Sequence, residues 1–294
     1  MKKVLITGAN GQDGKILSEI YHKKKFKVYC LNRRNLSKSS KKYSCIVNNL
    51  KSKKKLEIIL KKIKPNLIIH LASKNNSFSN RNKNDNYNKY YLENFEMTKN
   101  LVDAVVDTKL KSKFIFAGSS LMYEGLKKNI ITEKDKFNPI SFYGKYKVAS
   151  YNYIKKRKIN SITVILFNHD SKFRSKKFLI PRLINAFEKK DIKFINKIFS
   201  FNISGDFSDA NDICKGIYKL SLKNLKLDKI ILSSGRRFYL NNFIKKLNKK
   251  YKLPINKKVI SNEYKFIGIN KLAKKIINYN SATNLSDILI KNLC

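Results

Sequence analysis

Thr7-Gly8-Ala9-Asn10-Gly11-Gln12-Asp13-Gly14 is the stretch of sequence from which the fold of this chain can be inferred. It follows the apolar run Val4-Leu5-Ile6 and precedes an amphipathic stretch over 15–22, which together predict a strand, a glycine-rich turn and a helix. In such a turn Gly8 permits a tight bend, Gly11 lets the backbone approach a pyrophosphate, and Gly14 lets the helix pack close to the strand. The phosphates would bind the free N–H groups of the first helical turn. An ordinary glycine turn is the alternative interpretation.

The rest of the chain alternates strand-like and helix-like stretches, which predicts an α/β fold, a Rossmann-type doubly wound parallel sheet. The expected strands are Lys3–Thr7, Lys27–Asn32, Ser44–Val47, Leu67–Leu71, Lys113–Ala117, Ser161–Leu166 and Lys229–Leu232. The expected helices are Gly11–His22, Lys51–Lys62, Asn94–Thr108, Tyr143–Arg157, Ile180–Glu188, Ala210–Leu222 and Tyr239–Lys250. Asn75–Lys89, rich in Asn, Lys and Ser, is expected to be a mobile loop.

Tyr143 and Lys147 stand four residues apart in a stretch that is expected to be helical, so both face the same side of the helix. An ammonium beside a phenol lowers the pKa of the phenol and makes it a usable proton acceptor. Upstream, the apolar run Phe114–Ala117 predicts a buried strand that ends at Gly118-Ser119-Ser120, and ligands bind at such carboxyl edges of parallel sheets. We therefore expect Tyr143 and Lys147 to be catalytic, close to the hydroxyls at the end of this strand. A surface pair is the alternative, because this spacing arises easily in a chain rich in Lys and Tyr.

Arg33-Arg34 follow the second expected strand. An acidic residue there would bind the ribose 2′-hydroxyl of NAD, whereas arginine accommodates a 2′-phosphate. Asn32, at the acidic position, has no charge to repel that phosphate. The sequence therefore predicts NADP as the cofactor; the alternative is that both arginines merely belong to the general excess of basic residues.

The chain carries 65 Lys and Arg against 20 Asp and Glu, a formal net charge of +45. Such a charge is typical of proteins that bind nucleic acids or anionic membranes. Here, however, the basic residues are spread along the whole chain and accompany no zinc-finger or aromatic RNA-binding signature. Ile, Asn, Lys, Tyr and Phe are all abundant and share A/T-rich codons. We interpret the charge as compositional drift, with nonspecific RNA binding at low salt as a consequence.

The sequence of 294 residues has no run of eighteen apolar residues, so we expect no membrane span. The strand expected from Lys3 leaves no room for a signal peptide. Cys30, Cys45, Cys214 and Cys294 show no paired spacing, and the three histidines are scattered. We therefore expect a cytoplasmic protein with neither disulfides nor a metal site.

These features resemble the extended short-chain dehydrogenase/reductase family (the NAD-dependent epimerase/dehydratases), and within it the GDP-mannose 4,6-dehydratases. His70-Leu71-Ala72-Ser73 is similar to the family's "HLAA" turn, and Asn49-Leu50 to its "D-L" pair. "GANGQDG" is the subfamily's form of the glycine turn, and Leu166–Ser171, followed by Arg174, is similar to its "LFNHES" and arginine. Gly205–Ile213 resembles a later "RDW…RDY" stretch with both arginines missing.

The resemblance implies a Rossmann domain over residues 1–170, with elements that return at about 208–250, and a small C-terminal substrate-binding lobe over 171–207 and 251–294. It also implies a GDP-mannose-like nucleotide-sugar substrate and a homodimer or higher homo-oligomer that uses the Tyr143–Lys147 helix. The cofactor-binding residues would be Gly8, Asn10, Gly11, Gln12, Asp13, Gly14, Arg33, Arg34, Asn49, Leu50, Leu71, Ala72, Tyr143 and Lys147. The substrate-binding residues would be Ser120, Asn168 and Arg174, while His169 and Asn94 are expected to be structural, Asn94 alternatively a water-relay residue near Lys147.

The implied chemistry is hydride transfer at sugar C4, with Tyr143 exchanging the proton of the 4-oxygen, Lys147 tuning Tyr143 and Ser119 bonding the same oxygen. A 4,6-dehydratase also needs a carboxylate, which the family places two residues before the tyrosine of "ELYG". Aligned on Tyr123, that position holds Leu121, and Glu124 could substitute only if the loop were re-registered. Three alternatives follow: a dehydratase, a 4-keto reductase or epimerase, and a non-catalytic Rossmann scaffold that binds nucleotide or RNA.

Overall fold

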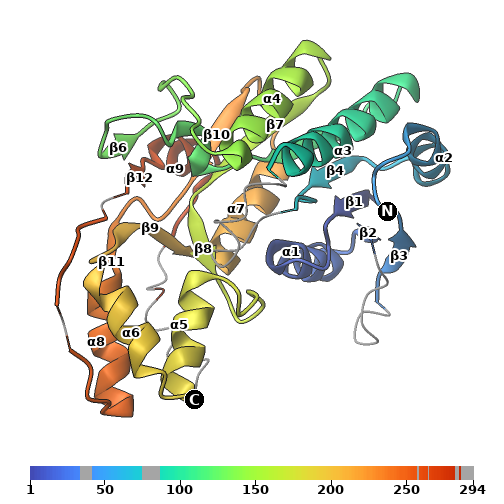
Figure 1. Cartoon of the computed structure of the whole chain (residues 1–294). Coiled ribbons are helices and arrows are strands. Elements are labelled where there is room, and N and C mark those ends of the chain that lie inside the picture. Colours follow the sequence, from blue (N-terminus) through green and yellow to red (C-terminus); the bar gives the residue numbers. More distant parts are fainter. Residues whose placement is uncertain (34–41, 75–86, 257, 264, 282–284, 286–294) are drawn as a thin grey trace.

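The central feature of the computed structural model is a seven-stranded parallel sheet (Figure 1). The structure describes residues 1–33, 42–74, 87–256, 258–263, 265–281 and 285. The strands lie in the order β10-β7-β5-β4-β1-β2-β3. Their bounds are β1 Lys3–Thr7, β2 Lys27–Asn32, β3 Ser44–Val47, β4 Leu67–His70, β5 Lys113–Ala117, β7 Ser161–Leu166 and β10 Lys229–Leu232. The expected doubly wound α/β fold is confirmed.

The order of the strands reverses at β1, which pairs with β2 on one side and with β4 on the other. In open parallel sheets, ligands bind beyond the carboxyl ends of the strands at such a switch point. The first connection of the chain runs from β1 through Gly8–Gly11 into helix α1, so the glycine turn lies at this point.

Helices cover both faces of the sheet, which explains why its strands are almost continuously apolar. One face carries α1 (Gln12–Lys23), α7 (Ala210–Ser221) and α9 (Lys271–Ile277). The other carries α2 (Lys53–Ile63), α3 (Tyr87–Asp107) and α4 (Phe142–Lys156). Along β1 the side chains alternate between these two cores: Val4 and Ile6 pack in the first and Leu5 in the second.

A second core lies apart from the sheet, among α5 (Leu179–Glu188), α6 (Ile192–Ser200) and α8 (Leu240–Tyr251), which stand together in Figure 1. The expected lobe boundaries therefore need two corrections. Helix α8, which we expected with the sheet, packs its apolar side on α5 and α6. Helix α9, which we expected in the lobe, places Ala273 and Ile277 in the core of the sheet.

The sequence analysis did not predict several short elements. They are β6 (Ile130–Ile131), β8 (Asn168–Asp170), β9 (Ser204–Asp209), β11 (Arg237–Tyr239), β12 (Ile267–Gly268), the 3-10 turn Ser120–Tyr123 (η4), and helices α6 and α9. Strands β11, β9 and β8 form one small sheet, and β12 and β6 form another. Helix α3 begins at Tyr87 rather than Asn94, so 87–89 are helical and not loop; the rest of that expected loop, 75–86, lies outside the described residues. In the described part of the chain, no helix has both the length and the apolar character to cross a membrane.

Candidate active site

The glycine turn between β1 and α1 leaves no space for side chains. Gly8 has φ +71°, and a Cβ there would lie 2.8 Å from the backbone nitrogen of Ala72. A Cβ on Gly14 would lie 2.4 Å from Cα of Ala9, so only glycine lets α1 begin this close to the strand. Helix α1 begins at Gln12 with no side-chain cap, and the amides of a first helical turn have no partner within the helix. These residues fit the pyrophosphate of a dinucleotide.

A cavity of about 520 Å³ opens on one side of this turn. Its lining residues come from the carboxyl ends of β1, β2 and β4, from the loop after β3 and from α3. They are Gly8, Asn10, Gly11, Leu31, Asn32, Arg33, Asn48, Asn49, Leu50, Leu71, Ala72, Ser73, Lys74 and Met97. Seven predicted cofactor-binding residues besides Arg33 are thus brought together here, whereas Arg34 lies outside the described residues. Their cofactor-binding roles stay predictions.

Asn32 ends β2 and is oriented by one hydrogen bond. Its Oδ1 accepts the backbone N–H of Asn10 at 2.9 Å. Because an N–H can only donate, the other end of the side chain must be the amide nitrogen. This Nδ2 is buried and has no hydrogen-bond partner among the described residues. The site thus presents a buried donor, and no negative charge, where an NAD-binding site would have a carboxylate.

A second cavity of about 410 Å³ lies on the other side of the turn and shares Gly8, Asn10, Gly11, Leu71 and Ser73 with the first. Ser119, Tyr143 and Lys147 all line it, although they come from β5's carboxyl end and from α4. Gln12, Asp13 and Gly14 line it too. The structure therefore brings the three predicted catalytic side chains to one cavity beside the glycine turn, and their roles stay predictions.

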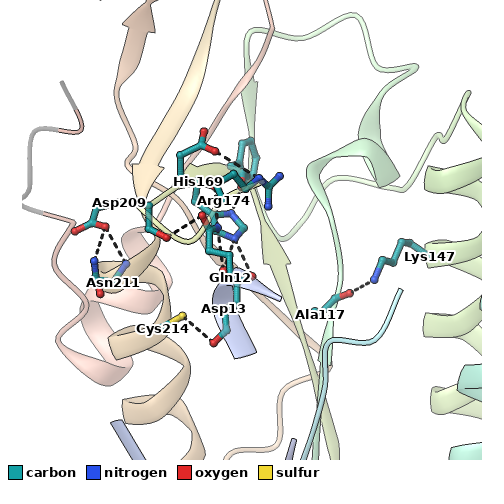
Figure 2. Close-up of polar contacts among 12 residues, drawn as sticks. Gln12, Asp13, Ala117, Lys147, His169, Arg174, Asp209, Asn211 and Cys214 are labelled. Atoms are coloured by element: carbon teal, nitrogen blue, oxygen red, sulfur yellow. Dashed lines mark hydrogen bonds and ion pairs between the residues drawn. The ribbon is translucent and has the colours of Figure 1, made fainter. Parts of the chain in front are cut away.

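Burial shifts the pKa of both Lys147 and Tyr143. The Lys147 Nζ donates to the carbonyl oxygen of Ala117 at 2.6 Å (Figure 2), and burial lowers the pKa of the lysine to about 7. Burial also raises the pKa of the Tyr143 phenol above its ordinary value of 10.0. The ammonium lies 5.6 Å from the Tyr143 ring centroid. In this structure the desolvated lysine thus binds a backbone carbonyl beside the phenol, and its effect on Tyr143 stays a prediction.

Gln12 and Asp13 have side chains that bind the protein itself (Figure 2). The Asp13 carboxylate accepts from His169 Nε2 at 2.9 Å, and the ring Nδ1 lies 2.6 Å from the carbonyl oxygen of Phe167. Gln12 donates to the His169 carbonyl at 3.1 Å and accepts from Ser171 at 3.0 Å. These contacts join α1 to β8, so the Gln12 and Asp13 side chains hold the cavity wall and only their backbone stays available for a cofactor.

His169 and Asn94, expected to be structural, are both buried. Burial would lower the pKa of His169, but the Asp13 carboxylate outweighs it and raises that pKa above its ordinary value. Asn94 bonds both backbone groups of Lys74, at 2.7 Å to the N–H and 2.9 Å to the carbonyl. Its amide is therefore committed to the loop after β4.

The predicted substrate-binding residues Ser120, Asn168 and Arg174 all line the second cavity. Arg174 stacks over the ring of Phe178 at 3.7 Å and lies 3.4 Å from Asp170. Asn168 donates to the Asp206 carbonyl at 3.3 Å. Arg174 is thus a preoriented planar cation at the cavity wall, a group suited to a phosphate.

The position at which the resembling dehydratases carry glutamate faces the same cavity and holds Leu121. Glu124 follows Leu121 by three residues. Its carboxylate accepts a hydrogen bond at 3.0 Å from the backbone N–H of Ser141, the residue just before α4. Glu124 does not line the cavity, so the re-registered loop that would let it substitute is not formed. Of the described residues that line this cavity, Asp13 is the only carboxylate, and His169 engages it.

Some lining residues were missed by the sequence analysis as site residues: Ser73, Lys74, Asn48, Met97, Phe173, Phe178 and Lys265. Ser73 could have been predicted as a site residue, because it lies close after the expected strand at 67–71. Lys265 could not have been predicted as a site residue, since it lies far along the chain and no motif surrounds it. Among the described residues, no group of three or more His, Cys, Asp or Glu side chains is arranged to hold a metal ion.

Comparison with known proteins agrees with this geometry. Residues 5–284 match the family described as GDP-mannose 4,6 dehydratase. A GDP-6-deoxy-D-talose 4-dehydrogenase of Aggregatibacter actinomycetemcomitans is 27% identical over 79% of this chain and 74% of its own length. GDP-mannose 4,6 dehydratase 2 of Caenorhabditis elegans is 26% identical over 82% of this chain and 69% of its own length.

Among solved structures, a UDP-glucuronic acid 4-epimerase from Bacillus cereus in complex with NAD has a TM-score of 0.81, 20% identity and 99% coverage of both chains. The NAD-dependent NDP-hexosamine 5,6-dehydratase TunA has a TM-score of 0.81 at 16% identity, covering 100% of this chain and 97% of its own. At such identities the structures share the fold.

Fold, site and matches together define an enzyme of the extended short-chain dehydrogenase/reductase type, among the nucleotide-sugar dehydratases and epimerases. Within that class the chain belongs to the GDP-mannose 4,6 dehydratase family. The family does not by itself fix the reaction, because its matched relatives include both a 4-dehydrogenase and 4,6-dehydratases.

Proposed function

We propose that this protein is an NADP-dependent oxidoreductase that acts at C4 of a GDP-linked hexose, with 4-keto reduction as its physiological direction. One observation carries the proposal: Ser119, Tyr143 and Lys147 line a cavity in which the only described carboxylate is Asp13, held by His169. A redox step at C4 needs a hydroxyl donor and a proton-exchanging phenol, and both are present. Loss of the 6-hydroxyl needs a carboxylate, and Leu121 occupies its expected place.

In this proposal Tyr143 gives its proton to the sugar 4-oxygen while Ser119 donates a hydrogen bond to the same atom. Lys147 binds the ribose next to the reacting ring, and Arg174 binds a phosphate of the nucleotide sugar. The nicotinamide, when bound, supplies the hydride chemistry. The 4-dehydrogenase from Aggregatibacter supports this assignment, since its printed activity is a redox step at C4.

NADP rather than NAD is the cofactor we propose. The buried Asn32 donor and the exposed Arg33 guanidinium both line the cavity next to the glycine turn, and both suit a 2′-phosphate. The solved neighbours in complex with NAD do not decide this point, because at identities of 20% or less they share the fold alone.

Two incubations test the function. NADPH with a GDP-4-keto-6-deoxyhexose should lose its absorbance, and NADP⁺ with GDP-mannose should yield no product that has lost water, by mass spectrometry. The Tyr143→Phe variant is the control and should be inactive. Loss of water from GDP-mannose would replace our proposal by the second candidate, 4,6-dehydration, which the family match favours.

We also propose that the enzyme is a cytoplasmic homodimer that associates through α3 and α4. Leu92 on α3 is 60% exposed, and Phe142 at the start of α4 is 38% exposed. Cys30, Cys45 and Cys214 are unpaired, in keeping with a reducing compartment. Light scattering of the wild type should give twice the mass of one chain, and Leu92→Glu should reduce it.

A further inference from the structure

A buried carboxylate at the end of β8 has no part in the proposed reaction. Asp170 is 5% exposed and lines neither cavity, although Asn168 and His169 just before it both line the second. Its Oδ1 makes no hydrogen bond with the described residues. A buried charge of this kind is costly unless an opposite charge compensates it. The compensating group is Arg174, whose Nε lies 3.4 Å from that oxygen.

Two turns after β8 bring this cation and an aromatic ring to the carboxylate. The backbone N–H of Arg174 donates to the Ser171 carbonyl at 2.9 Å, and that of Phe178 donates to the Ser175 carbonyl at 3.0 Å. The Ser171 hydroxyl donates to Gln12, which ties the first turn to helix α1. As a result, the Arg174 guanidinium lies over the Phe178 ring, 3.7 Å from the ring centroid.

These two contacts restrain the guanidinium in different ways. The Phe178 ring covers one face of its plane, and Asp170 pairs with its Nε. Because the ion pair is made through Nε, the two terminal nitrogens remain for a ligand, and they form the fork that binds two phosphate oxygens at once. Arg174 itself lines the second cavity. A side chain that is fixed before the ligand arrives loses less conformational freedom on binding, so it binds more tightly.

We propose that Asp170 is a positioning residue which, together with Phe178, holds the Arg174 guanidinium in the orientation that binds a phosphate of the nucleotide sugar. Asp170 acts through Arg174 and does not touch the substrate, since it lines neither cavity. The inference rests on the proposed function in one respect, the assignment of Arg174 to a phosphate. It does not depend on which reaction takes place at C4.

The test measures the binding of GDP and of guanosine, which lacks the phosphates, by calorimetry with NADPH in excess. Arg174→Lys keeps the charge but loses the fork, and should raise the Kd of GDP about tenfold while that of guanosine stays unchanged. Asp170→Ala should raise the Kd of GDP about fivefold through the lost preorganisation. Asp170→Asn, which keeps an oxygen acceptor for Nε, should bind GDP within about twofold of the wild type.

A double-mutant cycle shows whether Asp170 acts through Arg174. In the Arg174→Lys background, Asp170→Ala should weaken GDP binding no further, because no planar fork is left to orient. An equal loss in both backgrounds would overturn the proposal. So would tighter GDP binding by Asp170→Ala, which is the result expected if the carboxylate merely repelled the phosphate. Phe178→Leu leaves no buried charge unpaired, and the same cycle with this variant should give the same pattern even if Asp170→Ala does not fold.

Arg182→Lys is the matched control, since Arg182 lies over the ring of Phe194 at 4.5 Å but lines neither cavity. Its affinity for GDP should equal that of the wild type. If Arg174→Lys also leaves GDP binding unchanged, the assignment of Arg174 to a phosphate fails, and this inference fails with it. If Arg174→Lys weakens GDP binding but the Asp170 and Phe178 variants do not, the assignment stands and the inference alone is wrong.

Discussion

Among single residues, the pair of half-buried Asp13 and buried His169 does the most to join the two parts of the site. It links the first turn of α1 to β8 (Figure 2). A hydrogen bond between Ser171 and Gln12 completes the contact. Burial would raise the pKa of Asp13, but His169 outweighs it and lowers that pKa below 3.8. The pKa of His169 lies above 6.5. The pair is therefore ionised across a window that includes mildly acidic pH.

This pair gives a pH dependence with a definite sign. A raised histidine pKa contributes stability that is present below about pH 6.5 and is lost as pH rises through the folded-state pKa. A lowered aspartate pKa contributes stability that is present above about pH 3.8 and is lost as pH falls. His169→Gln should therefore lower the free energy of unfolding by about 1–3 kcal/mol at about pH 5.5 and by less at about pH 9.

Urea denaturation of the two proteins at both pH values measures this difference. His22→Gln is the control, since His22 is exposed on the same helix that carries Asp13. An effect of His169→Gln that is equal at both pH values would show that the ring acts by packing and not by charge.

Asn32 gives a second prediction about a single residue. Asn32→Asp keeps the acceptor for the Asn10 N–H but replaces the buried donor by a negative charge. We expect the Kd of NADP⁺ to rise at least about tenfold through repulsion of the 2′-phosphate, while that of NAD⁺ changes little. Fluorescence titration with both nucleotides measures this, with Asn49→Asp as the control at the rim of the same cavity. Equal weakening of both nucleotides would contradict the assignment of NADP.

Among the elements, helix α4 is placed by a close contact with the turn η4. A Cβ on Gly144 would lie 2.3 Å from the carbonyl oxygen of Leu121, which is backbone and cannot move aside like a side chain. Ser141 caps the helix, and Glu124 binds the Ser141 N–H. This contact sets how far Tyr143 reaches into the cavity.

Gly144→Ala should therefore push α4 away from η4. We expect a loss of about 1–3 kcal/mol of stability from overpacking, together with a fall in kcat of at least about tenfold because Tyr143 is displaced. Thermal unfolding and steady-state kinetics measure the two effects. Lys145→Ala, an exposed neighbour on the same helix, should leave both unchanged, and a Gly144→Ala enzyme with wild-type kcat would show that α4 tolerates the shift.

For the whole molecule, the dominant property is the formal charge of +45. Ion pairs neutralise part of it locally, as between Lys99 and Asp103 or Lys53 and Asp107 at 2.8 Å. The excess of positive charge creates a positive field around the molecule. Such a field attracts any polyanion, without selecting its sequence.

We therefore expect this protein to bind RNA at low salt, and to lose at least about tenfold in affinity between about 50 and about 200 mM KCl. Fluorescence polarisation with two labelled RNAs of unrelated sequence measures both the salt slope and the selectivity. The two RNAs should bind alike. Tight binding of one of them that survives high salt would favour a nucleic-acid function and count against our interpretation of the charge.

Six of the seven strands of the central sheet have the expected bounds, and β4 ends at His70, one residue earlier than expected. Strands such as Lys3–Thr7 and Ser161–Leu166 are bounded as expected, because a buried parallel strand is a short apolar run between polar turns. Strand β9 (Ser204–Asp209) could not be predicted in this way, since its sequence SGDFSD carries no apolar run. Its polar groups are satisfied by distant partners: the Asp206 carboxylate accepts from Ser234, Gly235 and Gly268.

The local pattern of apolar residues, glycines and the Tyr143–Lys147 spacing was enough to establish the sheet, the glycine turn and which side chains meet at its carboxyl edge. Those features follow from periods of two and 3.6 residues, which a chain displays along its own length. Only the tertiary structure decided three other features. They are the hydrogen bond of Asp13 with His169, the packing of α8 on α5 and α6, and the contact of Ser73 with Tyr146. Each joins residues far apart in the chain, and such pairings depend on the packing of whole elements, which no local period records.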